Sequence, residues 1–247
     1  MKRTWRPLIG TALALLLIFG VLYYLRHRRE SPAPPAGGGP PAVGTGGLPV
    51  MPSKPQPVNI TFKGCPPEGD GGDPLLNRLK NRVDEGNYLP VEFDAIARLA
   101  WPKAVEQKFR ARWSAGDRAA VEQYEGLPVA VEGYLARSKK EGPESPNCHG
   151  ADDEFRDFHI WLTKSPGDDR SQAIVVETTP PVRDKHPGWT TAALGQVARN
   201  NQRVRISGWL MLDPEHPDQV GKTRATIWEI HPIMKIEVEQ SGRWVIL

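Results

Sequence analysis

The sequence predicts a mainly β protein with some α-helix. We expect a small five-stranded Greek-key barrel with one helix between its third and fourth strands, preceded by a short helical lead-in and an N-terminal transmembrane helix. Three observations support this prediction. Apolar residues recur with period two from residue 127 onward, which is typical of strands with one buried face. Only residues 189–200 in that half have helical periodicity, and the run from Leu8 to Leu25 contains no charge.

The first element is this uncharged run. Its eighteen residues are close to the minimum length of a membrane-spanning helix. Three basic residues flank it on each side, Tyr23 and Tyr24 lie where an aromatic belt is expected, and no Ala-x-Ala cleavage site follows. We therefore expect residues 1–30 to be an uncleaved signal-anchor, a single-pass membrane segment. The free amino terminus adds to the positive charge before it, so we expect the remaining chain to lie outside the cytoplasm, in the cell envelope or periplasm.

The second element is a linker. Residues 31–57 contain nine Pro and six Gly, a composition that cannot bury a core and predicts a disordered tether. The anchor and the linker also hold seven of the 32 basic residues and only one of the 29 acidic ones. Residues 58–247 therefore carry 25 basic and 28 acidic residues, a formal charge of −3. Because nucleic-acid binding depends on neutralising phosphates, this acidic balance disfavours a nucleic-acid partner.

Residues 58–126 form the predicted helical lead-in, which we expect to pack on the barrel. Asp73 and Pro74 are typical of the start of a helix, which should run over residues 73–82. Asp94 can begin another turn. After Trp101-Pro102, Val105, Phe109 and Trp113 recur at four-residue spacing, so we expect a helix whose apolar stripe belongs to the core.

The barrel itself should occupy residues 127–247. We expect five strands, at residues 129–136, 158–162, 173–177, 204–212 and 224–238. The helix between the third and the fourth strand should lie at residues 189–200. We expect the last strand to be broken or bulged at Pro232, which cannot donate to a ladder.

This order of elements resembles the oligonucleotide/oligosaccharide-binding fold, or OB-fold. The resemblance also rests on Gly133 in the first strand and Gly208 in the fourth, where such barrels coil sharply. The chain is similar, moreover, to uncharacterised bacterial membrane-anchored proteins that end in WEIHP followed by IEV, here residues 228–232 and 236–238. That second resemblance implies no activity.

The OB resemblance implies a ligand site across the second and third strands, between two loops. These loops are residues 138–156, which contain His149, and residues 213–223, which contain Asp213, Glu215 and His216. Two histidines among carboxylates could bind a divalent metal, with His149 and His216 as ligands. The alternative is turn chemistry, since Asp and Pro residues are typical of tight turns.

Asp157, His159 and Trp161 should share the outer face of the second strand, opposite its apolar residues. Glu177 on the third strand should lie beside His159. An imidazole next to a carboxylate can act as acid and base, which makes His159 and Glu177 the catalytic candidates. A purely structural His–Glu contact is the alternative.

Three aromatic residues, Tyr134, Trp161 and Trp209, are also expected on outer faces. There they could stack against the sugar or base of a saccharide or other small ligand. The alternative is that the lead-in helices cover them.

The two cysteines, Cys65 and Cys148, allow one disulfide between the lead-in and the first ligand loop. Free thiols, or metal ligation by Cys148 and His149, are the alternatives.

Two functions follow from these observations. The first is an envelope-located OB-fold module that binds a saccharide, another small ligand or an envelope protein, without enzymatic activity. The second is a metal-dependent, nuclease-like hydrolase that uses His149, His159, Glu177 and His216. The Asp-Gly-Asp-Thr motif of staphylococcal-type nucleases is absent, so their catalytic residues cannot be assigned to this chain.

Overall fold

The computed structural model describes residues 47–49, 51 and 53–247 of the chain. The predicted anchor lies outside these residues, as does most of the predicted linker. No helix among the described residues combines the length and apolar character needed to cross a membrane. In chain order, the α-helices and strands are α2 (Pro74–Lys80), β1 (Leu89–Pro90), α3 (Phe93–Ala97), α4 (Ala115–Glu122), β2 (Pro128–Lys140), β3 (Phe158–Thr163), β4 (Ile174–Thr178), α5 (Pro180–Arg183), α6 (Thr191–Arg199), β5 (Arg203–Leu212), β6 (Trp228–Gln240) and β7 (Arg243–Ile246).

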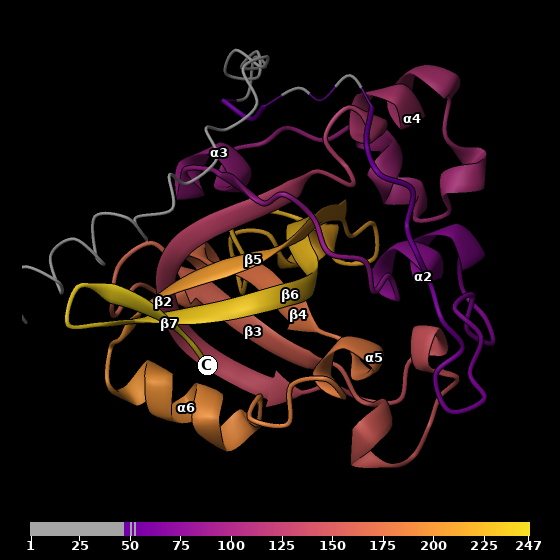
Figure 1. Ribbon diagram of the computed structural model, residues 1–247. Coiled ribbons are helices and arrows are strands. Elements are labelled where there is room, and N and C mark those ends of the chain that lie inside the picture. Colours follow the sequence, from indigo (N-terminus) through magenta and orange to yellow (C-terminus); the bar gives the residue numbers. More distant parts are fainter. Residues whose placement is uncertain (1–46, 50, 52) are drawn as a thin grey trace, which may run out of the picture. The chain divides into compact units, whose positions relative to one another are not determined.

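Five strands close into a barrel, as the alternation of apolar residues predicts (Figure 1). The order around the barrel is β2, β3, β4, β6 and β5, and β5 pairs with β2 to close it. All of these pairings are antiparallel except that of β4 with β6, where Val176 lies opposite Ile230. Two short edge strands, β1 beside β2 and β7 beside β6, were not expected from the sequence.

Two glycines allow the strands to approach one another closely. A Cβ on Gly133 would lie 2.5 Å from the carbonyl oxygen of Thr163, and one on Gly208 would lie 2.3 Å from that of Pro232. The pairing of β5 with β6 shifts register around Gly208, and a cis peptide bond joins His231 to Pro232. The expected irregularity at Pro232 is therefore present, but β6 continues through it.

The helices lie around the barrel. Helix α6 follows β4 as expected and buries Leu194 and Val197 (Figure 1). The short helix α5 was not expected, although Pro180 and Pro181 are favourable at the start of a helix.

The lead-in differs from its prediction around Phe109, where a helix was expected. Two 3-10 turns, Lys103–Gln107 and Arg110–Arg112, replace the expected helix, because Lys108 adopts a positive φ between them. Val105 and Trp113 are buried as expected, but Phe109 is 52% exposed. The α-helical turns resume only at α4, where the hydroxyl of Ser114 accepts a hydrogen bond from the backbone N–H of Asp117.

The packed part of the chain begins earlier than expected. Leu48 lies within the range predicted as linker, yet it is fully buried in the main core cluster. Farther along the same segment, the Lys54 ammonium donates to the carbonyl oxygen of Glu125 over 2.5 Å. Leu48 and Lys54, both within the predicted linker, therefore contribute contacts to the folded unit.

Candidate functional site

A polar cleft of about 330 Å³ opens on one side of the barrel. It lies at the strands and loops where the OB resemblance places a ligand. Its walls are formed by β3, β4, the end of β2 with the segment that follows it, and the loop between β5 and β6. The end of α2 and the start of β6 also contribute. The lining residues are Lys80, Arg137, Lys139, Glu141, Glu144, His159, Trp161, Arg170, Glu177, Asp213, Glu215, His216, Gln219, Thr223, Arg224 and Glu229.

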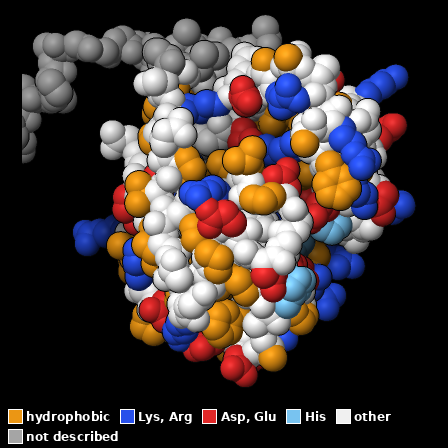
Figure 2. Space-filling view, turned by 90° about the vertical axis from the view of Figure 1, so that its right-hand side faces the viewer, with side chains coloured by type: hydrophobic (Ala, Val, Ile, Leu, Met, Phe, Trp, Pro, Cys, Tyr) orange, Lys and Arg blue, Asp and Glu red, His pale blue; other side chains and the backbone are white. Residues whose placement is uncertain are grey.

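Charges of both signs line this cleft, and no single sign dominates it. On the face of the molecule drawn in Figure 2, acidic and basic side chains are likewise interspersed, with histidine among them. The cleft is therefore suited to a ligand held by specific ion pairs more than to a long polyanion attracted by a uniform field.

His159 and Glu177 are cross-strand neighbours, as the alternation predicts. His159 Nδ1 lies 2.7 Å from Glu177 Oε1 and 3.1 Å from an oxygen of Glu141. Burial alone would lower the pKa of His159, but the two carboxylates outweigh it and raise the pKa to about 9. The imidazole is therefore protonated at neutral pH, so His159 cannot act as a general base there without losing this proton.

Trp161 is surrounded by cations. The guanidinium of Arg170 lies 5.2 Å from its ring centroid and the ammonium of Lys139 5.8 Å, while Arg137 is its partner on β2. Its indole N–H donates to the carbonyl oxygen of Thr223. Because Trp161 is only 5% exposed, its ring does not offer a free face for stacking.

The loop between β5 and β6 is organised by Asp213. This buried carboxylate accepts from the backbone N–H of Glu215 and contacts His216 Nδ1 at 2.6 Å and Arg224 Nη1 at 3.1 Å. Burial would raise the pKa of Asp213, but His216, Lys80 and Arg224 hold it well below its usual range. The turn chemistry expected for this loop and its charged contacts thus occur together in one residue.

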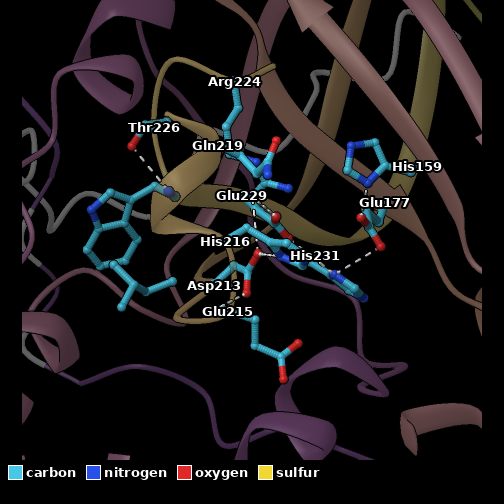
Figure 3. A network of polar contacts seen from close by, with 12 residues as sticks. His159, Glu177, Asp213, Glu215, His216, Gln219, Arg224, Thr226, Glu229 and His231 are labelled. Carbon is cyan, nitrogen blue, oxygen red and sulfur yellow. Dashed lines mark hydrogen bonds and ion pairs between the residues drawn. The ribbon is translucent and has the colours of Figure 1, made fainter. Parts of the chain in front are cut away.

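A buried polar layer underlies the cleft (Figure 3). It contains His231 and the carboxylates of Glu177 and Glu229. The buried carboxylate of Asp157 lies near His231 in the same layer. Arg224 Nη1 contacts Glu229 Oε1 at 2.6 Å, and Asn147 donates to Asp157 Oδ1 over 2.9 Å. Burial, together with the nearby Glu177, raises the pKa of Asp157 to about 6 despite the opposing effect of His231.

The lead-in and the loop after β2 cover this layer. Lys80, at the end of α2, is 8% exposed and lines the cleft. Glu144 also lines it, and burial together with Asp157 and Glu177 raises its pKa to about 8. The acidic floor is therefore partly balanced by one lysine from the N-terminal segment.

Three predicted site residues lie away from the cleft. His149 is exposed and contacts Asp70 at 3.4 Å, so the expected pair of metal ligands, His149 and His216, does not meet in one cluster among the described residues. Tyr134 is half-buried and outside the lining. Trp209, expected on an outer face, is 1% exposed, because the lead-in covers it and Asp84 accepts its indole N–H.

Cys65 and Cys148 form a disulfide with a Cα–Cα distance of 5.8 Å. This confirms the pairing expected from the sequence and excludes the thiol and metal-ligand alternatives for Cys148 in this structure. The bridge ties the loop that carries Asn147 and Glu144 to the start of the lead-in.

Several residues of the site were not singled out from the sequence: Lys80, Glu141, Glu144, Arg224, Glu229 and His231. For Glu229 and His231 a signal exists, because they alternate with the apolar Trp228 and Ile230 along one strand. For Lys80 there is none, because its place depends on how α2 packs against β6.

Comparison with known proteins identifies no relative. No model of a protein family matches the chain, and no curated protein matches it either. The functional argument therefore depends on the geometry of the cleft.

Proposed function

We propose that the protein is an OB-type binding module that holds a small anionic ligand in the polar cleft. The OB assignment is supported by the strand order, by the parallel pairing of β4 with β6, and by helix α6 between β4 and β5. The cleft, moreover, lies where OB barrels bind their ligands.

One observation carries the choice of ligand. Arg137 and Arg170 both line the cleft and both neighbour Trp161, and neither forms an ion pair with a carboxylate within 4.0 Å in the part of the chain that is described. Guanidinium groups bind phosphate and carboxylate groups with paired hydrogen bonds. Since Trp161 and Trp209 are both buried, a ligand held mainly by stacking, such as single-stranded nucleic acid, fits the cleft less well.

The location belongs to the same proposal. We infer that residues 8–25 anchor the protein in a membrane and that the barrel lies outside the cytoplasm. The disulfide supports this inference, because such bridges form and persist in oxidising compartments.

Calorimetric titration with inorganic phosphate and with citrate tests the ligand class. We expect Arg170→Gln and Arg137→Gln to weaken binding by about tenfold each, roughly the loss of one charge-assisted hydrogen bond. Arg243→Gln, an exposed arginine on β7, should bind as the wild type does. If neither anion binds the wild type, or if Arg243→Gln weakens binding equally, the proposal is wrong.

A second candidate function is a metal-dependent hydrolase. It is favoured by one observation: the contact of 2.7 Å between His159 and Glu177 faces the cleft. Cleavage of a phosphodiester such as bis(p-nitrophenyl) phosphate with added metal, lost in His159→Ala, would support it. No cleavage by the folded wild type with any added divalent ion would exclude it for this substrate class.

A further inference from the structure

His231 is a buried histidine without a hydrogen-bond partner. It is 1% exposed, and neither ring nitrogen makes a hydrogen bond within the described part of the chain. Its Nδ1 lies 3.6 Å from an oxygen of Glu177 and 3.6 Å from one of Glu229, and its Nε2 lies 3.7 Å from Asp157 Oδ2. These distances exceed those of hydrogen bonds. Figure 3 shows the ring between the Glu177 and Glu229 carboxylates.

The carboxylates of Glu177 and Glu229 each contact another side chain through one oxygen, and the other oxygen lies near His231. Glu177 Oε1 contacts His159, and its Oε2 is the atom near His231. Glu229 is held in the same way by Arg224.

Asp157 completes this pattern. Asn147 donates a hydrogen bond to its Oδ1, and among the described residues its Oδ2 has no hydrogen-bond partner. Metal ligands in proteins are commonly oriented by just such contacts from neighbouring groups.

The spacing of these groups is close to that of a metal site but wider. Two ligand atoms about 2.1 Å from a zinc ion, at a tetrahedral angle, lie roughly 3.4 Å apart. One ligand atom each from Asp157, Glu177 and His231 lie within 4.8 Å of one another. Glu177 lies nearest to Nδ1 of the ring and Asp157 nearest to Nε2, so ion binding requires small side-chain movements that bring both carboxylates to one ring nitrogen. The neighbouring set of Glu141, His159 and Glu177 differs, because its contacts of 2.7 and 3.1 Å are those of hydrogen-bonded ion pairs, so the atoms involved already have partners.

We propose that Asp157, Glu177 and His231 bind a divalent transition-metal ion, with Zn²⁺ the best fit to one imidazole and two carboxylates. The three residues come from neighbouring strands or their ends, since Asp157 precedes β3 and the other two lie on the paired strands β4 and β6. Glu177 lines the cleft, so an ion can enter from it and a water there can supply a fourth ligand. The inference does not depend on anion binding by Arg137 and Arg170.

The competing explanation is an imidazolium that neutralises the carboxylates with no ion present. It leaves two buried ring N–H groups without acceptors at hydrogen-bonding distance, which is costly. A zinc ion would coordinate one ring nitrogen and the unpartnered oxygen of Asp157. The two explanations differ in whether the folded protein binds metal with a stoichiometry of one.

Zinc binding by the full chain in detergent tests the proposal. After removal of metal with a chelator, the protein is titrated with Zn²⁺ against a fluorescent zinc indicator. We expect one equivalent to bind. His231→Gln and Asp157→Asn should weaken binding by more than about 100-fold. Asn147→Ala should weaken it by about 10- to 100-fold, the range for loss of a group that orients a metal ligand.

His149→Gln is the matched control, because it removes an exposed histidine outside both the cluster and the cleft and should leave zinc affinity unchanged. Should the buried variants fail to fold, the wild type still decides the matter through Co²⁺ substitution. A four-coordinate site gives intense visible absorption with a stoichiometry of one. A folded wild type that binds neither ion, or a folded His231→Gln that binds Zn²⁺ as tightly as the wild type, overturns the proposal.

Discussion

The guanidinium of Arg82 lies 3.3 Å over the ring of Trp209. Both side chains are 1% exposed, and Arg82 also holds Asp84 through an Nη2–Oδ2 contact of 2.6 Å. Asp84 in turn accepts the indole N–H of Trp209 through its backbone carbonyl. This cluster joins the lead-in to β5 and removes Trp209 from the surface where a ligand could have stacked on it.

Arg82→Ala should therefore destabilise the fold strongly. It leaves Asp84 without its partner and opens a gap over Trp209, for which we expect a loss of about 3 kcal/mol in the free energy of unfolding. Arg82→Lys should recover little of it, because an ammonium neither stacks flat nor forms paired hydrogen bonds. Arg78→Ala, at an exposed position of the preceding helix α2, should cost less than about 1 kcal/mol in urea denaturation. Equal effects of Arg78→Ala and Arg82→Ala would contradict this account.

The same cluster shows where sequence analysis succeeds and where it does not. The five strands were predictable because apolar alternation directly reflects one buried face. The loops of the cleft follow from the strand order, and the His159–Glu177 contact follows from register. Coverage of Trp209 by the lead-in was one of two alternatives that the sequence allowed. The sequence could not decide between them, because the partner Arg82 is far away along the chain and the strand pattern around Trp209 does not change when a segment packs over it.

His231 shows a second kind of difficulty. In sequence it precedes Pro232 and is most simply interpreted as a residue of an irregular strand. Its importance depends on Asp157 and Glu177, which reach it only through the pairing of β4 with both β3 and β6. The prediction that Phe109 is buried was wrong for a local reason. The positive φ of Lys108 interrupts the helical spacing on which that prediction depended.

The Cys65–Cys148 disulfide should contribute substantially to stability. It joins residues 83 positions apart, and closing a loop of that length in the unfolded chain is worth roughly 4 kcal/mol in the chain-entropy model. We expect Cys65→Ser with Cys148→Ser to lower the free energy of unfolding by about this amount. Reduction of the wild type should give the same loss, whereas a reductant should not affect the double variant. An unchanged unfolding midpoint after full reduction would rule out this role.

The His216–Asp213 contact predicts a defined pH dependence. The hydrogen bond that His216 donates to the Asp213 carboxylate raises the pKa of His216. The contact therefore stabilises the fold fully below about pH 6.5, the ordinary value, and is lost as the pH rises through the raised pKa. Asp213 behaves in the opposite way, because its pKa is lower in the folded state than in the unfolded state. Its contribution to the free energy of unfolding is present above its ordinary pKa and is lost as the pH falls toward the lowered value.

The stability difference between wild type and His216→Gln should thus be largest near pH 5 to 6.5 and decline above it. Because His216 is half exposed, we expect only a few tenths of a kcal/mol, roughly the value of a surface pair. Urea denaturation at several pH values measures this difference, and the exposed His149→Gln serves as the control. A difference that grows toward pH 9 would have the wrong sign.

Gly208→Ala should disrupt the closure of the barrel. The added Cβ would lie 2.3 Å from the carbonyl oxygen of Pro232 and 2.6 Å from a methyl carbon of Ile230, so β5 and β6 would have to separate. Overpacking of this kind costs about 1 to 3 kcal/mol. Gly188→Ala, where an added methyl meets nothing within 4 Å, is the matched control. Thermal unfolding of both variants measures the effect, and equal midpoints would show that the strands adapt without cost.

Leu48 determines where the folded unit begins. Its side chain is fully buried in the main core, so Leu48→Ala should lower the free energy of unfolding by about 2 to 5 kcal/mol, the range for Leu→Ala in cores.

A chain that starts at residue 58, the boundary suggested by composition, should be destabilised at least as much, because it also loses the contact of Lys54 with Glu125. A chain that starts at residue 47 should keep the stability of the full-length protein. Circular dichroism during urea unfolding distinguishes the two boundaries. If the chain starting at residue 58 is as stable as the one starting at residue 47, the Pro-rich segment is a tether over its whole length and the burial of Leu48 is energetically unimportant.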